Sequence, residues 1–558
     1  MRKHRARFAV LVVLLAAGIA GAAEDWGRVF TKGPYLQSPG EDTMTIMWES
    51  PVEAKAVVRY GKGRRLDRQL EVAPSFTVPR QDAKAPDSSL PADRAYHFYE
   101  ATLTGLKPGV RYQYSVELAG AATPARTFRT FDRGARRTTF IAYGDSRSNP
   151  DLHDRVTAGF LEHKPDFILH NGDIVARGHL YELWKREFFD PLNGVLGSVP
   201  FCPALGNHET ASDAKTSAPK GGNYYLHFHL PGNEVFYSLD QGPVHVLVLD
   251  YRYPEATHAQ YAFAEKDLME STAAWKIVQL HVPMFNVGGH TSTWGLDTYL
   301  PLFRRAKVDL VIAGHSHLYE RFRPVAPVEG ADRWPITYIT SGGGGASLYP
   351  SYEHPGLAAT SMTNHYVVFE ATRSRLRGKA LTPDEKTLDQ FTLTKRNGEY
   401  GKKYLSQAVA EEGLRLGFAF KDPLTVRLDD APATDRAAAA VFDFSQYVRD
   451  GRLVEPESKK TILDFSRFAG AGQPLGIEIE LTAPSGACYT IENAPVRLTL
   501  PAPAGEEAKA RVLVRARGTK PIAVSRGRMA PRLVFQAKLR SPWGSGLAIG
   551  GECGVRVK

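Results

Sequence analysis

The 558-residue sequence has only three cysteines, no long apolar run beyond its N-terminus and no dense block of basic residues. So few cysteines exclude a small disulfide-rich scaffold; Cys488 and Cys553 could pair, which would leave Cys202 single. After the N-terminus no segment approaches the ~18 apolar residues of a membrane-spanning helix. The formal net charge of +10 is mild for this length, and basic residues are not interleaved with aromatics. We therefore expect no nucleic acid as a stable partner.

The first 22 residues have the order of a secretory signal peptide. Residues 2–7 carry four Lys or Arg side chains and no acid, residues 8–17 are apolar, and residues 20–22 are small. This order predicts a signal peptide over residues 1–22 and a secreted or periplasmic protein. The apolar run is short for a ~30 Å hydrocarbon core, so a retained membrane anchor is the less favoured alternative. Once the signal is removed, no membrane association is expected.

Residues 26–130 alternate apolar and polar side chains with the period of a β-strand. Examples are residues 44–48 and 112–116, and Pro-Gly turns separate such runs. This pattern predicts a small β-sandwich. The segment 103–109, followed by Tyr112, resembles a fibronectin type III module.

Residues 137–395 instead alternate apolar strand-like runs with helical patterns, which is typical of a layered α/β domain. Residues 405–558 return to strand alternation, as in 476–481, and predict a C-terminal β-rich domain of unknown role. The predicted fold class is therefore multidomain, α/β plus all-β, with a central α/β sandwich between two β-rich domains. The predicted buried strands of the central domain are 140–143, 167–169, 246–249, 277–280 and 310–313.

Side chains that bind metals follow five apolar runs of the central domain. If these runs were neighbours in one sheet, their carboxyl ends would bring the side chains together. Carboxylate, amide and imidazole donors suit Fe, Mn or Zn, and the absence of nearby thiolates other than Cys202 argues against a closed structural zinc site. The set predicts two ions that share one carboxylate, activate a hydroxide and clamp a phosphoryl oxygen. The residues are Asp145, Asp173, Asn207 with His208 and Glu209, His281, and His315 with His317.

The order of these motifs resembles the calcineurin-like metallophosphoesterase superfamily and, more narrowly, its purple acid phosphatase branch. Residues 314–321 read Gly-His-Ser-His-Leu-Tyr-Glu-Arg and match the branch's Gly-His-x-His-x-Tyr-Glu-Arg signature. Residues 281–286, followed by His290, resemble its His-x-Pro-x-Tyr-Asn stretch and substrate histidine. A fibronectin-like module before the catalytic domain is also the branch's usual arrangement.

The resemblance implies a role for each of these residues. Asp173 would bridge the two ions, and His208 and His290 would contact the phosphoryl group and protonate the leaving alcohol. The first ion would be held by Asp145, Asp173 and His317, and the second by Asp173, Asn207, His281 and His315.

Two positions depart from the superfamily's patterns. Ala176 stands where the purple enzymes carry a metal-binding tyrosine, so we predict no purple charge-transfer band. Arg147 stands where other branches place a metal-binding histidine, and a guanidinium is not a normal metal ligand. Three alternatives remain open: Arg147 clamps substrate phosphate, His153 or His170 completes the first metal's ligands, or that metal is weakly held or absent.

Other residues near these motifs have two interpretations each. Gly342–Gly345 could bring a loop close to the site or form a tight turn, and Trp294 could line a substrate pocket. Structural roles are favoured for Glu209, Glu320 and Arg321.

The predicted function is metal-dependent hydrolysis of a small phosphate ester, with a phosphomonoesterase preferred. A phosphodiesterase on the same site is one alternative, and an exported binding protein with a degenerate catalytic domain is the other. The motifs do not predict the oligomeric state.

Overall fold

The computed structural model describes residues 26–411 apart from 211–221, 291, 293, 328–332, 350 and 352–355. It also describes residue 414 and the backbone of strands within 424–557. The predicted signal peptide, residues 1–22, lies outside the described residues, as does Cys488 of the suggested disulfide. Every described helix is too short or too polar to span a lipid bilayer.

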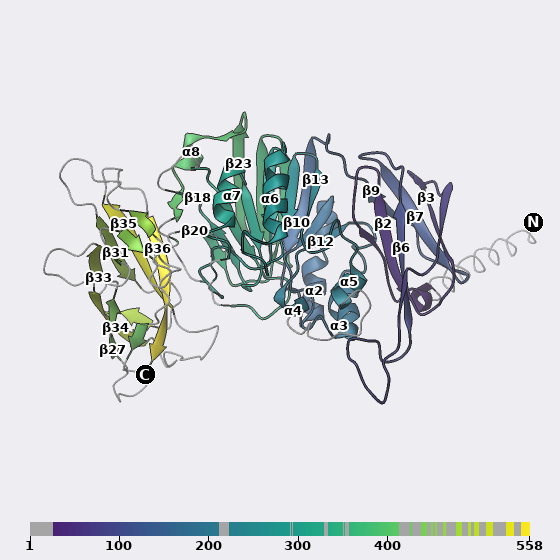
Figure 1. The fold of residues 1–558 in the computed structure, drawn as a ribbon, viewed down its shortest axis with the longest axis horizontal. Coiled ribbons are helices and arrows are strands. Elements are labelled where there is room, and N and C mark those ends of the chain that lie inside the picture. The colour runs from purple at the N-terminus through teal and green to yellow at the C-terminus, as the bar shows by residue number, and fades with distance from the viewer. Residues whose placement is uncertain are drawn as a thin grey trace, which may run out of the picture.

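The N-terminal part is the predicted β-sandwich, and it lies at one end of the molecule (Figure 1). Side chains from both sheets, including Trp48, Tyr99 and Tyr114, form one apolar cluster between them. The narrower resemblance to a fibronectin type III module stays a prediction. One sheet has the order β1 (Lys32–Gln37), β2 (Met44–Ser50), β6 (Tyr96–Leu103), β5 (Phe76–Val78). The other has the order β4 (Arg68–Val72), β3 (Ala56–Lys62), β7 (Arg111–Leu118), β8 (Ala121–Ala122), with β9 (Arg126–Arg129) also on β7.

Two seven-stranded sheets form the centre of the molecule. One large apolar cluster contains buried side chains of both, such as Phe140 and Ile277, so the core lies between the sheets. The first sheet has the order β12 (Phe201–Pro203), β11 (Phe167–His170), β10 (Arg137–Tyr143), β21 (Tyr366–Thr372), β22 (Arg375–Leu381), β23 (Thr387–Arg396), β24 (Glu399–Tyr400). The second has the order β13 (Tyr237–Gln241), β14 (Val244–Val248), β15 (Trp275–Gln279), β16 (Leu310–Ala313), β19 (Thr337–Ser341), β17 (Tyr319–Phe322), β20 (Leu357–Ser361).

The helices lie outside these sheets. Figure 1 shows α6 and α7 side by side in front of the central strands, and α2 to α5 grouped along the lower edge. Their bounds are α2 Pro150–Thr157, α3 Tyr181–Trp184, α4 Asn207–Thr210, α5 Asn223–His227, α6 Ala259–Glu270 and α7 Tyr299–Arg305. In α2 the Asn149 side chain accepts the N–H of Leu152, and Pro150 occupies the first turn, both of which favour a helix start.

The five predicted strands are not neighbours in one sheet. Residues 140–143 and 167–169 fall in the first sheet, whereas 246–249, 277–280 and 310–313 fall in or at the end of strands of the second. Within each sheet these strands are parallel to their neighbours in this set. Periodicity marks a segment as a buried strand but carries no information about its pairing partner. The metal-binding side chains must therefore come together from two sheets.

The central domain extends further along the chain than residue 395. Helix α8 (Lys402–Leu405) follows β24, and β25 (Val409–Ala410) pairs with β18 (Val325–Ala326). Tyr400, Val409 and Leu414 belong to the central apolar cluster. The boundary proposed at residue 405 thus falls inside a segment that packs on the central domain.

The chain beyond this segment is β-rich, as predicted, and its strands lie at the opposite end of Figure 1 from the N-terminal sandwich. A five-stranded sheet has the order β26 (Leu424–Val426), β36 (Ala548–Val557), β35 (Arg532–Arg540), β31 (Gly476–Thr482), β33 (Val496–Leu500). Two three-stranded sheets are β27 (Ala437–Asp443), β34 (Lys509–Ala516), β32 (Tyr489–Ile491) and β28 (Val448–Arg449), β29 (Arg452–Val454), β30 (Thr461–Asp464).

Candidate metal centre

The predicted ligands lie in loops at the carboxyl ends of strands of both sheets. Asp145 follows β10 and Asp173 follows β11, while His281 and His315 follow β15 and β16. The loops of the two sheets contact one another: the His315 N–H donates to Asp145 Oδ2 at 2.8 Å, and the Asn171 side-chain amide donates to Ala313 O at 3.3 Å. The two sheets therefore end at a common site.

The backbone at this site adopts uncommon conformations. Asp145, Asp173 and His315 have φ angles of 58°, 57° and 65°, which non-glycine residues rarely adopt. Gly206, before Asn207, has no room for a side chain, because an added Cβ would lie 2.1 Å from the Asp173 amide nitrogen. Strain of this kind persists where the surrounding structure fixes the backbone, and it is common at functional sites.

Ligand atoms gather into two groups that share one carboxylate. Asp173, His281 and His315 form one group, and Asp145, Asp173 and His317 form the other, with the atoms of each group within 4.8 Å of one another. Asn207 joins the first group, since its Oδ1 lies 2.9 Å from His281 Nε2. The structure thus brings together all six predicted ligands, with Asp173 in the shared position.

The donor atoms fit metal ions. Asp145 Oδ1 is buried and has no hydrogen-bond partner in the described structure, which is costly for a carboxylate unless a cation is bound. His281 Nδ1–H donates to Asn171 O at 2.7 Å, so in the neutral ring Nε2 offers a lone pair to the site. His317 Nδ1–H donates to Ser347 O at 2.7 Å and orients its Nε2 in the same way. Such backbone partners are typical of histidines that bind metals.

The ionisation of the site also suits cations. Burial opposes the charge on Asp173, but His281, His208 and the N–H donated by His208 outweigh it and hold the pKa of Asp173 below its usual value. Burial, followed by the neighbouring His281 and His290, lowers the pKa of His315 to about 2. A charged aspartate beside a neutral histidine is the form in which both residues bind metals.

His208 and His290 lie beside the ligand groups and belong to neither. His208 Nδ1–H donates to Ala176 O at 2.6 Å, and its Nε2 lies 3.7 Å from Asp173 Oδ2. The His290 ring stacks on His315 with the ring centroids 4.2 Å apart. Both imidazoles therefore lie beside the ligand groups, outside the sets of converging atoms.

Arg147 extends its guanidinium to both ligand groups. Its Nε lies 3.3 Å from Asp173 Oδ2, and a terminal nitrogen lies 3.4 Å from His317 Nε2. The side chain is 14% exposed, so it borders the solvent-facing side of the site. This position is compatible with a phosphate clamp.

The two histidines considered as replacement ligands are buried elsewhere in the loop network. His153 Nδ1–H donates to Glu187 O at 2.9 Å, and in the neutral ring its Nε2 accepts from the Tyr143 hydroxyl at 3.0 Å. His170 Nε2 contacts Ser146 Oγ at 3.0 Å. Neither residue is in a described group of converging ligand atoms, so the geometry gives no support to this alternative.

Two buried glutamates hold the loops of the site. Glu209 accepts the N–H groups of Asp173, Ile174 and Gly206 at 2.8–2.9 Å, and burial, then the Asp173 charge, raises its pKa to about 8. Glu320 accepts the N–H groups of Val287 and Gly288, in the loop that leads to His290.

Other predicted neighbours have purely structural contacts. Arg321 pairs with Asp389 at 2.6 Å. An added Cβ on Gly342 would lie 2.3 Å from Ser316 O, so the glycine run packs tightly on the ligand loops. Trp294 is only 7% exposed and donates its indole N–H to Tyr251 O, so it is buried, and its place in a substrate pocket stays a prediction.

Sequence reasoning missed several residues of the site. The Tyr349 ring stacks on His317 at 4.3 Å, and its hydroxyl lies 3.3 Å from His290 Nε2. Ser316 Oγ accepts the His290 N–H at 3.1 Å. Ser316 lies within a recognised motif and could have been noticed, whereas Tyr349 lies in a loop with no motif of its own.

Two family models match the chain. The model described as calcineurin-like phosphoesterase matches residues 139–319, which include all six predicted ligands. The model described as purple acid phosphatase, N-terminal domain, matches residues 32–130. The matches coincide with the central domain's ligand-bearing strands and with the N-terminal sandwich.

Similar proteins span both matched regions. Purple acid phosphatase 21 of Arabidopsis thaliana is 30% identical over 57% of this chain and 72% of its own length. Probable inactive purple acid phosphatase 1 of the same plant is 27% identical over 63% of this chain and 67% of its own. The structure of a purple acid phosphatase from yellow lupin (Lupinus luteus) superposes with a TM-score of 0.54 at 19% identity, covering 65% of this chain and 74% of the lupin chain.

Proposed function

Because the chain belongs to the purple acid phosphatase family of calcineurin-like phosphoesterases, and so to the metal-dependent phosphoric ester hydrolases, we propose that it hydrolyses phosphate esters at a two-metal site between its central sheets. The observation that carries this proposal is the pair of converging ligand groups that share Asp173. In the proposed assignment Asp145, Asp173 and His317 hold one ion, and Asp173, Asn207, His281 and His315 hold the other. Fe, Mn and Zn all suit these donors.

When bound, two such ions supply Lewis acidity to a phosphoryl oxygen and lower the pKa of water. The protein's own residues would do the rest. Arg147 would bind phosphoryl oxygens through its forked N–H donors, for which its position over both ligand groups is suitable. The purple enzymes of the family carry a tyrosine ligand at the position of Ala176. Because this chain has an alanine there, we expect no purple charge-transfer band.

His208 and His290 would hold the phosphoryl group and give a proton to the leaving oxygen. Their contacts with Ala176 O and Tyr349 fix the two rings beside the metal ligands. Imidazole is suited to proton transfer, since its ordinary pKa lies near neutrality.

We propose a phosphomonoesterase, with a phosphodiesterase as the second candidate. Arg147, His208 and His290 add three donors around the phosphoryl group, which suits the greater charge and the additional free oxygen of a monoester. A panel of p-nitrophenyl phosphate and bis-p-nitrophenyl phosphate separates the two candidates.

The test of the shared aspartate is Asp173→Asn, with exposed Asp151→Asn on α2 as the matched control. We expect Asp173→Asn to reduce turnover by at least ~10²-fold and to lower metal content, because the residue serves both ligand groups. Turnover and metal stoichiometry, the latter by plasma mass spectrometry, should be measured on the same samples. Full activity in Asp173→Asn would contradict the assignment. No turnover of either ester by the wild type under added Fe, Mn or Zn would instead favour a degenerate, binding-only protein.

A further inference from the structure

A second cavity, of about 600 Å³, opens at the other ends of the strands that carry the metal ligands. Lys276 lines it near the start of β15, five residues before His281, and Asp309 lines it just before β16, six residues before His315. At ~3.3 Å per residue the cavity lies about 17–20 Å along the strands from the ligand loops. It is therefore separate from the proposed catalytic site.

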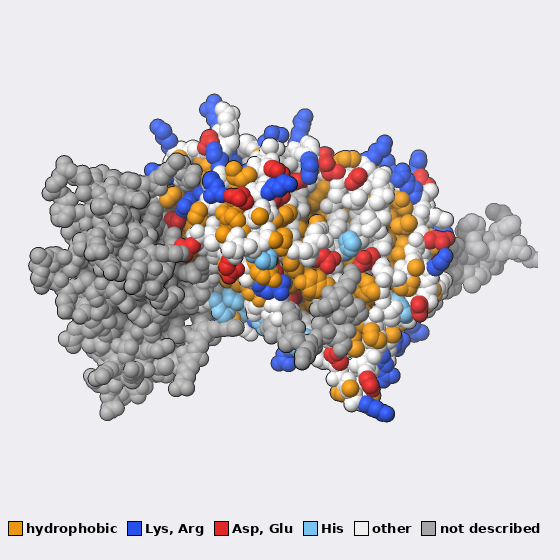
Figure 2. All heavy atoms as spheres, in the orientation of Figure 1, with side chains coloured by type: hydrophobic (Ala, Val, Ile, Leu, Met, Phe, Trp, Pro, Cys, Tyr) orange, Lys and Arg blue, Asp and Glu red, His pale blue; other side chains and the backbone are white. Residues whose placement is uncertain are grey.

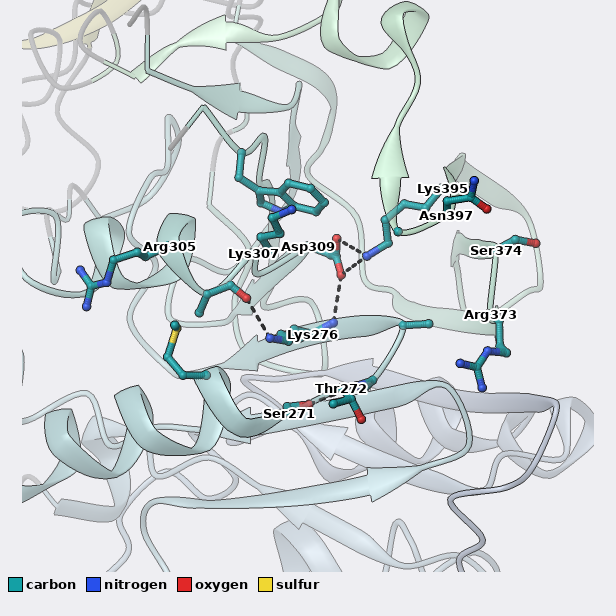
Figure 3. A pocket seen from close by; sticks show the side chains of 16 residues that line it. Ser271, Thr272, Lys276, Arg305, Lys307, Asp309, Arg373, Ser374, Lys395 and Asn397 are labelled. Atoms are coloured by element: carbon teal, nitrogen blue, oxygen red, sulfur yellow. Dashed lines mark hydrogen bonds and ion pairs between the residues drawn. The ribbon is translucent and has the colours of Figure 1, made fainter. Parts of the chain in front are cut away.

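The lining of this cavity is strongly cationic (Figure 3). Among the described lining residues, Asp309 is the one carboxylate, and it is already neutralised. Both of its oxygens lie 2.9 Å from Lys395 Nζ, and the Tyr400 hydroxyl donates to it at 2.8 Å. Five cations line the same cavity: Lys276, Arg305, Lys307, Arg373 and Lys395.

Three of these cations are available to a ligand. Arg305 and Lys307 form ion pairs with Glu265 and Glu399, but all four side chains are 42–63% exposed, so water screens these pairs and they are readily exchanged. Arg373 is exposed in the turn between β21 and β22 and has no ion-pair partner among the described residues. Figure 2 shows Lys and Arg side chains projecting along the upper margin of the central domain, above α6, α7 and β23.

The two remaining cations have fixed roles. Lys395 pairs with Asp309, and Lys276 donates to Leu268 O at 2.7 Å and Ala306 O at 3.0 Å, at the ends of α6 and α7. Lys395 offsets the charge of Asp309, and Lys276 is held by backbone carbonyls, so neither is free to meet a ligand.

Apolar groups form the rest of the wall. Met269 is 53% exposed, an unusual position for a large apolar side chain, and Ala273, Ala306 and Trp334 lie around the same space. Trp334 and Ala306 are already buried, but a small inorganic anion would leave Met269 and the partly exposed Ala273 in contact with water. An anion with an apolar body would cover them while its charged group meets the guanidinium of Arg373.

We propose that this cavity binds an organic anion: a carboxylate, sulfonate or phosphate group carried on an apolar or aromatic body. The guanidinium of Arg373 presents paired N–H donors that match planar and tetrahedral oxyanions. Met269 and Ala273 supply the apolar contact, and a mixture of apolar and charged groups is the usual composition of a small-molecule site. The inference does not depend on the proposed catalytic activity.

The test uses the fluorescent aromatic sulfonate 1-anilinonaphthalene-8-sulfonate, which no phosphatase can hydrolyse, on the full metal-loaded chain. Arg373→Glu should raise its Kd at least about tenfold, because an attraction becomes a repulsion. Ala273→Trp should remove the same signal by filling the space, without a change of charge. Arg375→Glu is the matched control, since this exposed arginine lies two residues away and does not line the cavity.

An unchanged Kd in both Arg373→Glu and Ala273→Trp would overturn the proposal. An equal rise of the Kd in Arg375→Glu would also overturn it, because it would show that the probe is attracted to positive charge in general. Competition then identifies the charged group. Displacement of the probe by phenylphosphonate indicates a phosphate-type ligand, and displacement by benzoate indicates a carboxylate. Displacement by benzenesulfonate indicates a sulfonate, and failure of all three to displace the probe would also overturn the proposal.

Discussion

Arg147 is the residue whose role most affects how the site would work. Its guanidinium contacts Asp173, which both ligand groups share, and His317, which belongs with Asp145 to one of them. Among the described hydrogen bonds and ion pairs, His281 and His315 of the other group have no such contact with an arginine or lysine. A substrate phosphate that enters the site would find these N–H groups beside the metal ligands.

We therefore expect Arg147→Ala to raise KM for p-nitrophenyl phosphate and to lower kcat/KM by about 10–100-fold. A loss of this size corresponds to the removal of one or more charged hydrogen bonds. Metal content should not fall, because a guanidinium is no ligand. Arg155→Ala, at the exposed end of α2, is the control. An unchanged KM would show that Arg147 does not clamp the substrate.

Single residues also show how far sequence reasoning reaches. Asp145, Asp173, His281 and His315 could be predicted, because each directly follows a buried apolar run. Tyr349 could not, since its contacts with His290 and His317 depend on how a loop folds back. The burial of Trp294 against Tyr251 could not be predicted either, because sequence does not show the exposure of a side chain.

At the scale of loops and strands, the site depends on the close approach of backbone segments. The turn after β12 passes so near the turn after β11 that Gly206 has no space for a methyl group beside the Asp173 amide. The elements themselves were predictable from apolar runs, but their division between two sheets was not, because strand pairing is decided by tertiary packing.

Gly206→Ala should therefore destabilise the protein by about 1–3 kcal/mol, the usual cost of overpacking, and displace Asp173 enough to lower metal content. Gly194→Ala is the matched control, since an added Cβ there meets nothing within 4 Å. Thermal unfolding and metal stoichiometry measure the two effects. Equal stability of the two variants would contradict the close approach of these turns.

A charged triad joins the hairpin β13–β14 to helix α6. His245 lies 2.8 Å from both Asp240 and Asp267; burial opposes its charge, but the two aspartates outweigh this and raise its pKa to about 9. The stabilisation by this histidine is complete below its unfolded pKa of about 6.5 and is lost as the pH rises through 9. It amounts to at most ~3 kcal/mol.

We expect the wild type to lose this stability between pH 6.5 and 9, and His245→Asn to lose less over the same range. Denaturant unfolding at pH 6 and pH 9 gives the comparison. Parallel losses in the two proteins would show that His245 is not held in its charged form.

At the scale of the whole molecule, the proposed metal centre joins two halves of the central domain. Asp145, Asp173 and Asn207 come from the first sheet, whereas His281, His315 and His317 come from the second. Ions bound between them would stabilise the folded protein over the unfolded chain. The family models match residues 32–130 and 139–319, so related proteins contain counterparts of both regions.

Chelation should accordingly lower the Tm of the wild type by several degrees, in line with a loss of a few kcal/mol. Asp173→Asn, which we expect to bind metal poorly, should show little change with chelator. A Tm that does not respond to chelator in the wild type would argue against ions that connect the two sheets.

The division of the ligands between two sheets also sets an order of events in time. The first three ligands are complete by residue 207, but their counterparts begin 74 residues later, at His281. An ion that met the chain early would find only half of the proposed ligands. Metal binding at the proposed centre would then be one of the last steps of maturation, after the two sheets have packed on each other.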